Sequence, residues 1–221
     1  LGAHLVTWIA AVQLTTVANA AVFFSINPVI TAVASWLLFG ERIGRRLLAA
    51  IGFGLLGVAV IGWGELGLSA ARLSGDLWAM LCSLLFTVYV LLGRSLRQSI
   101  PTLAYVTVLY GTASLLCFVA AAVLGLPLAG YDARTWLAFA LLALVPTVLG
   151  HSGINYALRY IGPGRIAAAT LLEPPLAGLI AFFAWGEALT PLVAVGYLLA
   201  AASVLLLSLD LSLSRGRHTS R

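Results

Sequence analysis

Long hydrophobic runs without formal charge cover most of the chain, and short segments rich in Gly, Pro and Arg separate them. The hydrocarbon core of a bilayer takes about 20 apolar residues of helix, with a range of roughly 17–25. The run at 166–185 has this length and contains one acidic residue, Glu173. Together with the shorter apolar segment 1–14, the pattern predicts an all-α polytopic membrane protein with about eight helices in this chain. The remaining runs of suitable length lie at 17–39, 47–64, 77–93, 102–125, 135–157 and 188–209.

The composition supports membrane insertion and argues against nucleic-acid binding. The chain is 62% hydrophobic and 9% charged, whereas soluble domains contain about 25% charged residues. The net charge of +5 comes from Arg residues at the ends of apolar runs, which form no basic patch. Cys82 and Cys117 each lie inside an apolar run and have no metal-binding or redox spacing. We interpret both as small buried side chains and predict no cofactor.

Two weakly similar copies of one pattern occupy residues 17–60 and 163–206, offset by 146 positions without a gap. Each copy contains a residue-proline pair inside its apolar run, then a Gly-Glu pair, then small residues spaced four apart. The matched positions are Asn27-Pro28 with Glu173-Pro174, Gly40-Glu41 with Gly186-Glu187, and Ala50 and Gly54 with Gly196 and Ala200.

Arg residues in the short loops predict the orientation, because cytoplasmic loops carry an excess of positive charge. Ten Arg residues fall on one side and two, Arg72 and Arg134, on the other. We therefore expect a multi-pass protein of the cell inner (plasma) membrane with a cytoplasmic C-terminus. The two copies then cross the membrane in opposite directions. An inverted repeat with a proline-interrupted helix in each half is typical of secondary transporters. The ten are Arg42, Arg45, Arg46, Arg94, Arg97, Arg159, Arg165, Arg215, Arg217 and Arg221.

The two halves differ in length, since five spans follow the Arg72 loop and three precede it. If the halves match, an intact protein has an inverted five-plus-five arrangement, and this chain lacks the first two helices. We divide the chain into residues 1–66 (helices 3–5, the remainder of the first repeat), 75–211 (helices 6–10, the second repeat) and a basic cytoplasmic tail at 212–221.

The repeat motifs resemble a known family. Ala18-Asn19-Ala20-Ala21, Asn27-Pro28 and Leu38-Phe39-Gly40-Glu41-Arg42 are similar to the first repeat of the EamA-type transporters of the drug/metabolite transporter superfamily. Leu172-Glu173-Pro174 and Trp185-Gly186-Glu187 are similar to the second repeat. The resemblance implies ten helices, cytoplasmic termini, and transport of small organic metabolites, with amino-acid or drug-like solutes first. The chain departs from the pattern at Asn27, where many relatives carry a small or hydroxyl residue.

Glu173 is the main candidate in the solute pathway, because an ionisable residue inside a membrane span is costly and marks a function by default. Pro174 and Pro175 follow it and lack an N–H. We expect Pro174 to hold Glu173 out of helical geometry and to free carbonyls one turn earlier. The alternative is structural, with a protonated Glu173 bonding the broken backbone of a neighbouring helix.

Three further polar residues and a tyrosine complete the candidate pathway. Asn27, beside Pro28, is expected to donate to a substrate carboxylate or carbonyl, or else to cap a neighbouring helix. His151 and Asn155 are four residues apart and share a helix face. Tyr89 is a candidate aromatic lining residue. A proton relay through His151 and Glu173 stays open, and no metal site is predicted.

Ala50 and Gly54, like Gly196 and Ala200, form small-residue faces that allow close helix packing. We assign them to contacts between the halves, with homodimerisation as the alternative.

The predicted function is a secondary transporter that works by alternating access. The sequence has no P-loop for ATP. An intramembrane enzyme is disfavoured, since no nucleophile–base or metal motif is present. A non-transporting scaffold or sensor in the lipid bilayer is the remaining alternative.

Overall fold

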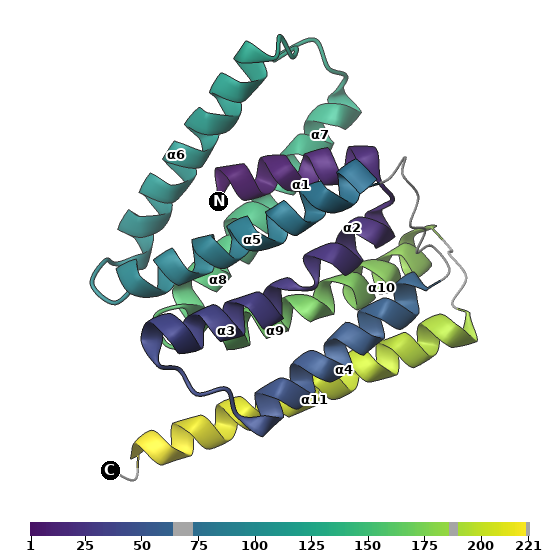
Figure 1. The fold of residues 1–221 in the computed structure, drawn as a ribbon. Helices are drawn as coiled ribbons and strands as arrows, with labels where there is room; N and C mark the ends of the chain where they lie inside the picture. The colour runs from purple at the N-terminus through teal and green to yellow at the C-terminus, as the bar shows by residue number, and fades with distance from the viewer. Residues whose placement is uncertain (64–72, 186–189, 220–221) are drawn as a thin grey trace.

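The computed structural model describes residues 1–63, 73–185 and 190–219. In these ranges the chain is helical throughout, apart from short connections (Figure 1). A π-helical segment η1 (Ala143–His151) joins α7 to α8, and a 3-10 turn η2 (Thr170–Leu172) joins α9 to α10. The α-helices are α1 (Gly2–Leu14), α2 (Val17–Phe24), α3 (Asn27–Phe39), α4 (Arg45–Gly62), α5 (Leu73–Leu96), α6 (Thr102–Val123), α7 (Ala133–Leu142), α8 (Ser152–Ala157), α9 (Pro163–Ala169), α10 (Glu173–Trp185) and α11 (Pro191–Thr219).

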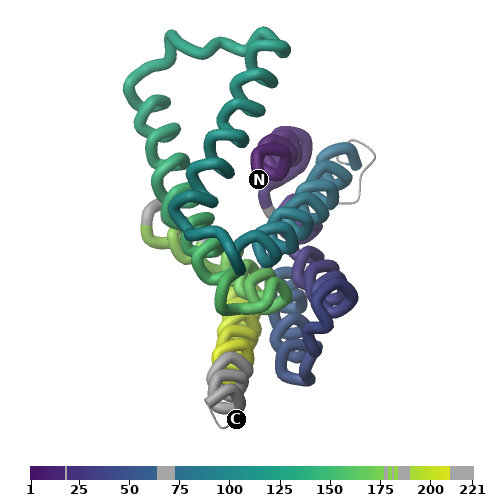
Figure 2. The backbone as a smooth tube through the Cα atoms, turned by 90° about the vertical axis from the view of Figure 1, so that its left-hand side faces the viewer, coloured from purple at the N-terminus to yellow at the C-terminus, as the bar shows by residue number. Residues whose placement is uncertain are grey.

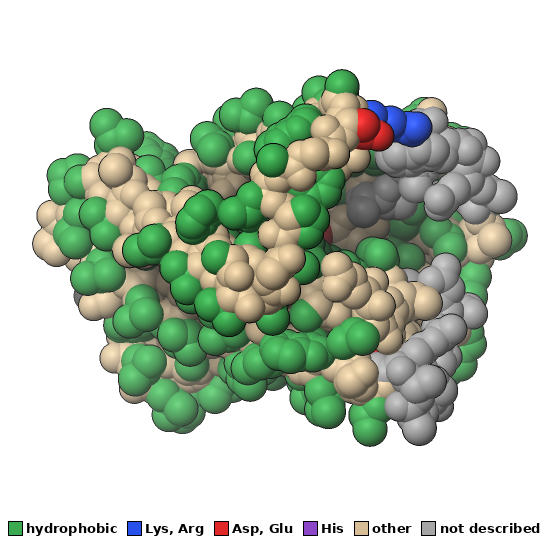
Figure 3. All heavy atoms as spheres, turned by 90° about the horizontal axis from the view of Figure 1, so that it is seen from above, with side chains coloured by type: hydrophobic (Ala, Val, Ile, Leu, Met, Phe, Trp, Pro, Cys, Tyr) green, Lys and Arg blue, Asp and Glu red, His purple; other side chains and the backbone are tan. Residues whose placement is uncertain are grey.

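Six helical segments among the described residues are long and apolar enough to cross a bilayer, and α1 is a shorter apolar helix. The predicted all-α polytopic class is therefore confirmed. Hydrophobic side chains also cover much of the outer surface (Figure 3), as expected for a surface in contact with lipid. The six segments are Asn19–Phe39, Arg45–Gly62, Leu73–Leu96, Thr102–Val123, Ala133–Ala157 and Pro191–Leu209.

Prolines lie next to the breaks in two of the spans. Pro28 occupies the first turn of α3, where its missing N–H costs no helical hydrogen bond. In the apolar run at 166–185 the break is η2, which lies immediately before Glu173 and the two prolines. The expectation that Pro174 keeps Glu173 out of helical geometry is wrong, since Glu173 has φ −58° and ψ −50°. The tighter turn takes up the distortion instead. The Glu173 N–H bonds to the carbonyl of Thr170, so this carbonyl is not free.

Helices α4 and α11 are equivalent elements of the two sequence copies, and they run in opposite directions along the most extensive contact between helices (Figure 1). Helix α3 packs in the same antiparallel sense on α9, whose equivalent in the first copy is α2. On the α4–α11 seam, Gly57 faces Gly196, and Ser203 Oγ donates to the Ala50 carbonyl at 2.7 Å. The small residues of both faces thus lie on one seam inside a single chain. Ala50 and Ala200 are buried there, and Gly54 abuts the Leu171 side chain.

The centre of the bundle is α5, which contacts α1, α2 and α3. Its buried side chains Cys82, Phe86, Tyr89 and Val90 form one core cluster with residues of α2, α8 and α9. In contrast, α6 and α7 form a hairpin that projects from one side of the bundle (Figure 2). Helix α6 still packs on α1, whereas α7 buries no residue.

The loop before α7 ends in an N-cap. The Asp132 carboxylate accepts a hydrogen bond from the Thr135 N–H at 2.7 Å, and this bond lowers the pKa of the Asp132 carboxyl. A capped start satisfies one of the backbone donors that every helix leaves unpaired.

Candidate functional site

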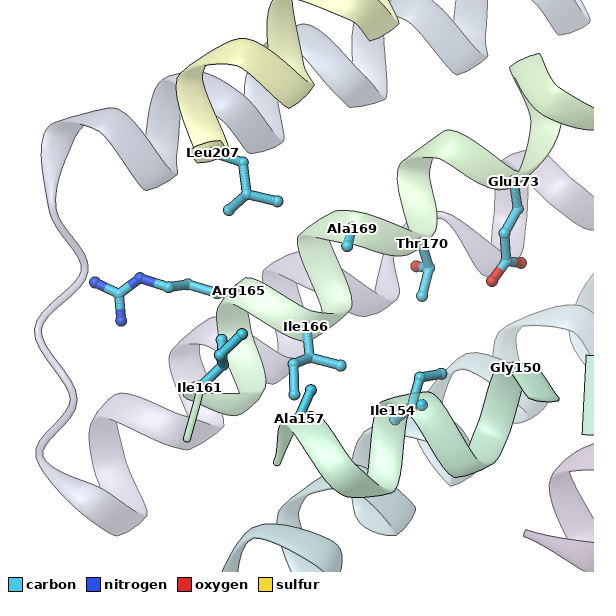
Figure 4. Close-up of a pocket in the computed structure, with 11 residues that line it drawn as sticks. Gly150, Ile154, Ala157, Ile161, Arg165, Ile166, Ala169, Thr170, Glu173 and Leu207 are labelled. Atoms are coloured by element: carbon cyan, nitrogen blue, oxygen red, sulfur yellow. The ribbon is translucent and has the colours of Figure 1, made fainter. Parts of the chain in front are cut away.

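A pocket of about 390 Å³ lies between α8, α9, α10 and α11, beside the η2 turn (Figure 4). Most of its wall is apolar. The lining residues are Gly150, Gly153, Ile154, Ala157, Ile161, Arg165, Ile166, Ala169, Thr170, Glu173 and Leu207.

Glu173 provides the one carboxylate of this pocket, and its side chain is exposed there. In Figure 4 the side chains of Thr170 and Glu173 point to the same side, toward α8. Arg165 points the other way. It precedes Glu173 by eight residues, which corresponds to about 12 Å along a helix. An ionisable residue in an apolar pocket beside a break in a helix is the arrangement expected of a membrane solute site.

Asn27 lies directly behind the pocket wall. Its Nδ2 donates to the Phe24 carbonyl at 3.1 Å and to Thr170 Oγ1 at 3.3 Å, and Thr170 lines the pocket. Asn27 is fully buried, and its Oδ1 has no hydrogen-bond partner. The sequence-based expectation that Asn27 donates to a substrate stays a prediction, and it requires one of these two bonds to break. Its donors already have partners, and its unpaired atom is an acceptor.

Asn155, His151 and Tyr89 lie close together where the segment His151–Asn155 faces α5, and none of the three lines this pocket. Asn155 Nδ2 donates to the His151 carbonyl at 2.7 Å, and Asn155 Oδ1 is unpaired. His151 Nδ1 and Tyr89 Oη are also buried without a partner. The rings of Tyr89 and His151 are 5.6 Å apart between centroids. His4 of α1 completes the group, with its ring 6.0 Å from that of His151.

Aromatic rings fill the space between these groups in the centre of the bundle. Phe86 of α5 contacts the rings of His4, Phe24 and Tyr89 at centroid distances of 5.3, 5.6 and 5.8 Å. The cluster places π faces beside the polar residues, where a cation can be attracted by the ring quadrupoles.

Several polar residues of this region were missed in the sequence. Ser83 Oγ is buried and unpaired, and Thr87 bonds Thr31 across α5 and α3 at 2.8 Å. Ser83 and Thr87 are four residues apart and share one face of α5. That four-residue spacing could have indicated a polar face on α5. It is a weak signal, because hydroxyl residues are common in membrane helices and often bond the backbone of their own helix.

An ion pair joins helix ends at the arginine-rich end of the bundle. Arg94 Nε lies 3.5 Å from Glu41 Oε1, and Glu41 Oε2 accepts a bond from Ser35 Oγ at 2.7 Å. Arg94 Nη1 also donates to the carbonyls of Leu158 and Arg159 at 2.9 and 3.2 Å. The Glu41 carboxylate lies against Gly162, where a Cβ has no room. These contacts tie the ends of α3, α5, α8 and α9 together.

Removing the charge of Glu41 should loosen this end of the bundle. In Glu41→Gln the pair with Arg94 is lost, and we expect a cysteine placed at the pocket residue Ala169 to react faster with a membrane-impermeant maleimide. The pair is partly exposed, at 25% and 21%, so the free energy of unfolding should change by less than about 1 kcal/mol. The reaction is measured from each side of the membrane, with Cys82 and Cys117 replaced by Ala.

The matched control is Arg159→Gln, which removes an exposed charge at the same end. Only the backbone carbonyl of Arg159 bonds Arg94. Equal reaction rates in Glu41→Gln and Arg159→Gln would show that the ion pair does not restrict access.

Comparisons with known proteins agree on one family. A model of the EamA-like transporter family matches residues 2–63 and 73–209. An uncharacterized transporter of Archaeoglobus fulgidus is 28% identical over 202 residues, which are 90% of this chain and 70% of that protein. A probable terminal-alkyne amino-acid exporter of Streptantibioticus cattleyicolor is 28% identical over 196 residues, 86% of this chain and 63% of that one.

The fold is also similar to a solved crystal structure, with a TM-score of 0.82 and 21% sequence identity. That similarity covers 95% of this chain and 74% of the solved one. The chain spans less than two thirds of the S. cattleyicolor exporter. Because the family model extends over most of the chain, this multi-pass membrane protein belongs to the EamA-like transporter family.

Proposed function

We propose that the protein is a secondary transporter that moves a small organic metabolite across the inner membrane by alternating access. The observation that carries the proposal is the Glu173 carboxylate, the one acid that lines an apolar pocket beside η2, the turn that separates α9 from α10. The pocket lies between elements of the second repeat, and Asn27 of the first repeat bonds one of its lining residues. Movement of one repeat relative to the other therefore changes the pocket directly.

Amino-acid-like solutes are the first class to test. The S. cattleyicolor relative is named as an exporter of a terminal-alkyne amino acid. A pocket of about 390 Å³ falls within the usual range for small-molecule sites, roughly 300–1,000 Å³. The arginine-rich end is assigned to the cytoplasm, together with the C-terminus, because of the positive-inside rule.

The test is solute counterflow with the longest natural chain that contains this sequence, reconstituted in proteoliposomes with a mixed metabolite pool. In Glu173→Gln we expect counterflow to fall at least about tenfold, since a hydrogen bond to a charged group contributes about 1.5–3 kcal/mol. The thermal midpoint of unfolding in detergent should stay unchanged, because the glutamine keeps the shape of the side chain.

The matched control is Asp132→Asn, which neutralises an exposed carboxylate outside the pocket and keeps a good N-cap residue. Full counterflow in Glu173→Gln would return Glu173 to a structural role. Absence of counterflow in every protein, for all solutes of the pool, would favour the scaffold or sensor alternative.

A further inference from the structure

A line of buried polar side chains runs along one face of α3. Asn27, Thr31 and Ser35 are spaced four residues apart, so they lie above one another on the helix. Their exposed fractions are 0%, 0% and 1%. Polar groups inside a membrane are costly unless they are paired or face a water-filled cavity. A polar face that is buried over three turns therefore needs either partners or a function.

Helix α5 presents a second polar face to α3. Ser83, Thr87 and Arg94 recur at intervals of four and seven residues, the spacing of one helix face. Thr31 Oγ1 and Thr87 Oγ1 are 2.8 Å apart, and Arg94 pairs with Glu41, just beyond the end of α3. Both helices end at the arginine-rich end of the bundle (Figure 1). The two polar faces therefore run in the same direction, toward the end assigned to the cytoplasm.

Two atoms of these faces have no hydrogen-bond partner among the residues that the structure describes. Ser83 Oγ and Asn27 Oδ1 are unpaired, and both side chains are 0% exposed. Each lies four residues before one member of the Thr31–Thr87 bond, which is one helical turn closer to the middle of the membrane. A buried polar atom without a partner costs about 1–3 kcal/mol. A polar molecule that enters this interface would supply the missing partners.

The repeat does not need this polar face in order to fold. Positions 27, 31 and 35 correspond to positions 173, 177 and 181 of the second copy, at the offset of 146. The second copy has Glu, Ala and Phe at these positions, so it lacks both hydroxyl groups. Helices α3 and α10 nevertheless have the same length of 13 residues. The hydroxyl groups of α3 consequently serve a purpose beyond building the repeat.

We propose that the interface between α3 and α5 is the cytoplasmic half of the solute pathway, closed in this structure. Helix α3 belongs to the first repeat and α5 to the second, so alternating access separates the two polar faces. The hydroxyl and amide groups then become free to donate to a solute and to accept from it. At its inner end the interface reaches the Glu173 pocket, since Asn27 bonds the lining residue Thr170.

The chemistry of the two faces also indicates which solutes fit. The five side chains inward of the Glu41–Arg94 pair are hydroxyl or amide groups without formal charge. They offer donors and acceptors but no counter-charge, which suits neutral or zwitterionic polar solutes. This inference rests on the proposed transport function and adds to it the route to the cytoplasm. The five are Asn27, Thr31, Ser35, Ser83 and Thr87.

The alternative is that the two polar faces are permanent contacts between helices, since hydroxyl groups often bond across membrane helices. The two explanations differ in whether water ever enters the interface. A cysteine reacts as its thiolate, which forms in water. A thiol that stays sealed between helices, or that faces lipid, is therefore unreactive toward a membrane-impermeant maleimide.

The test is the maleimide reaction of single cysteines, from each side of proteoliposomes. The protein is the longest natural chain that contains this sequence, with Cys82, Cys117 and any other native cysteine replaced by Ala. We expect Thr31→Cys and Ser35→Cys to react from the cytoplasmic side. The matched control is Val33→Cys, on the opposite face of the same helix and 44% exposed. It should react at least about tenfold more slowly, because hydrocarbon does not solvate a thiolate.

Equal rates for Thr31→Cys and Val33→Cys would identify the polar faces as static packing and overturn the inference. Reaction of Thr31→Cys from the outer side alone would contradict it as well. Counterflow by a protein whose Thr31→Cys and Ser35→Cys variants never react would reject this route and leave the transport function standing. A reactive Thr31→Cys in a protein without counterflow for any solute would support the opening and contradict transport.

A cross-link gives the second measurement. In Thr31→Cys/Thr87→Cys the two thiols replace hydroxyl groups that are in contact, so oxidation should join α3 to α5. We expect counterflow to fall to the level of protein-free liposomes on oxidation and to recover on reduction. The single variants Thr31→Cys and Thr87→Cys, oxidised in the same way, are the controls. Full counterflow through the cross-linked protein would show that the solute takes another route.

Discussion

Gly196→Val should prevent α4 and α11 from packing in their native register. A Cβ at Gly196 is placed 2.5 Å from Ile61 Cγ1 and 3.0 Å from the carbonyl oxygen of Gly57. The isoleucine can change its rotamer, but the backbone oxygen of α4 cannot move alone. Because α4–α11 is the most extensive helix contact in the described chain, we expect the free energy of unfolding to fall by about 3 kcal/mol, the upper end of usual overpacking costs.

The measurement is the thermal unfolding midpoint in detergent, together with the monodisperse fraction on size-exclusion chromatography. Gly52→Val is the matched control, since a Cβ at Gly52 of the same seam helix α4 meets no atom within 4 Å. Both variants lose the same glycine flexibility and gain the same side chain. If they unfold at the same temperature, close approach at the α4–α11 seam is not what stabilises this helix pair.

Helix positions were predictable from the sequence because the bilayer fixes the length of an apolar span. The predicted run at 102–125 corresponds to α6 (Thr102–Val123), and the run at 135–157 to α7, η1 and α8. The prolines also indicated where two spans are interrupted. Their effect on the backbone was not predictable, because a 3-10 turn before Glu173 relieves the steric conflict that a single pre-proline residue would otherwise bear.

Side-chain partners in the candidate site were harder to predict, for a physical reason. Membrane helices are apolar on every side, so the hydrophobic pattern does not show which face meets which neighbour. Nothing in the sequence indicated that His4 and His151 meet, whereas the structure places their ring centroids 6.0 Å apart. Likewise, nothing in the sequence indicated that the amide nitrogen of Asn27 is held by the carbonyl of Phe24.

The buried Arg97 connects this local geometry to the rest of the fold. Loop arginines were interpreted in the sequence as orientation signals, yet Arg97 is only 1% exposed. Its Nε donates to the carbonyl of Asn155 at 2.9 Å, and its two terminal nitrogens donate to the Ile100 carbonyl and to Thr102 Oγ1. One guanidinium thus joins the end of α5 and the start of α6 to α8, where Asn155 lies.

Arg97→Met should therefore lower both stability and solute binding. Three acceptors lose a charged donor, one of them buried and two partly buried. An unpaired buried acceptor costs about 1–3 kcal/mol, so we expect a loss of roughly 3 kcal/mol in the free energy of unfolding. Arg97→Lys should recover only part of it, since an ammonium cannot reproduce the planar fork of five N–H donors. The stability of both variants is measured from their thermal unfolding midpoints in detergent.

The control is Gln98→Met, because the neighbouring Gln98 is exposed and bonds only the carbonyl of Arg94. That variant should match the parent protein within about 0.5 kcal/mol. A stable Arg97→Met protein with unchanged solute counterflow would show that α8 keeps its place without the guanidinium. A stable protein with reduced counterflow would instead separate the effect on transport from the effect on stability. Arg97 would then act mainly by positioning Asn155, since its side chain bonds the backbone of that residue and is not one of the residues that line the pocket.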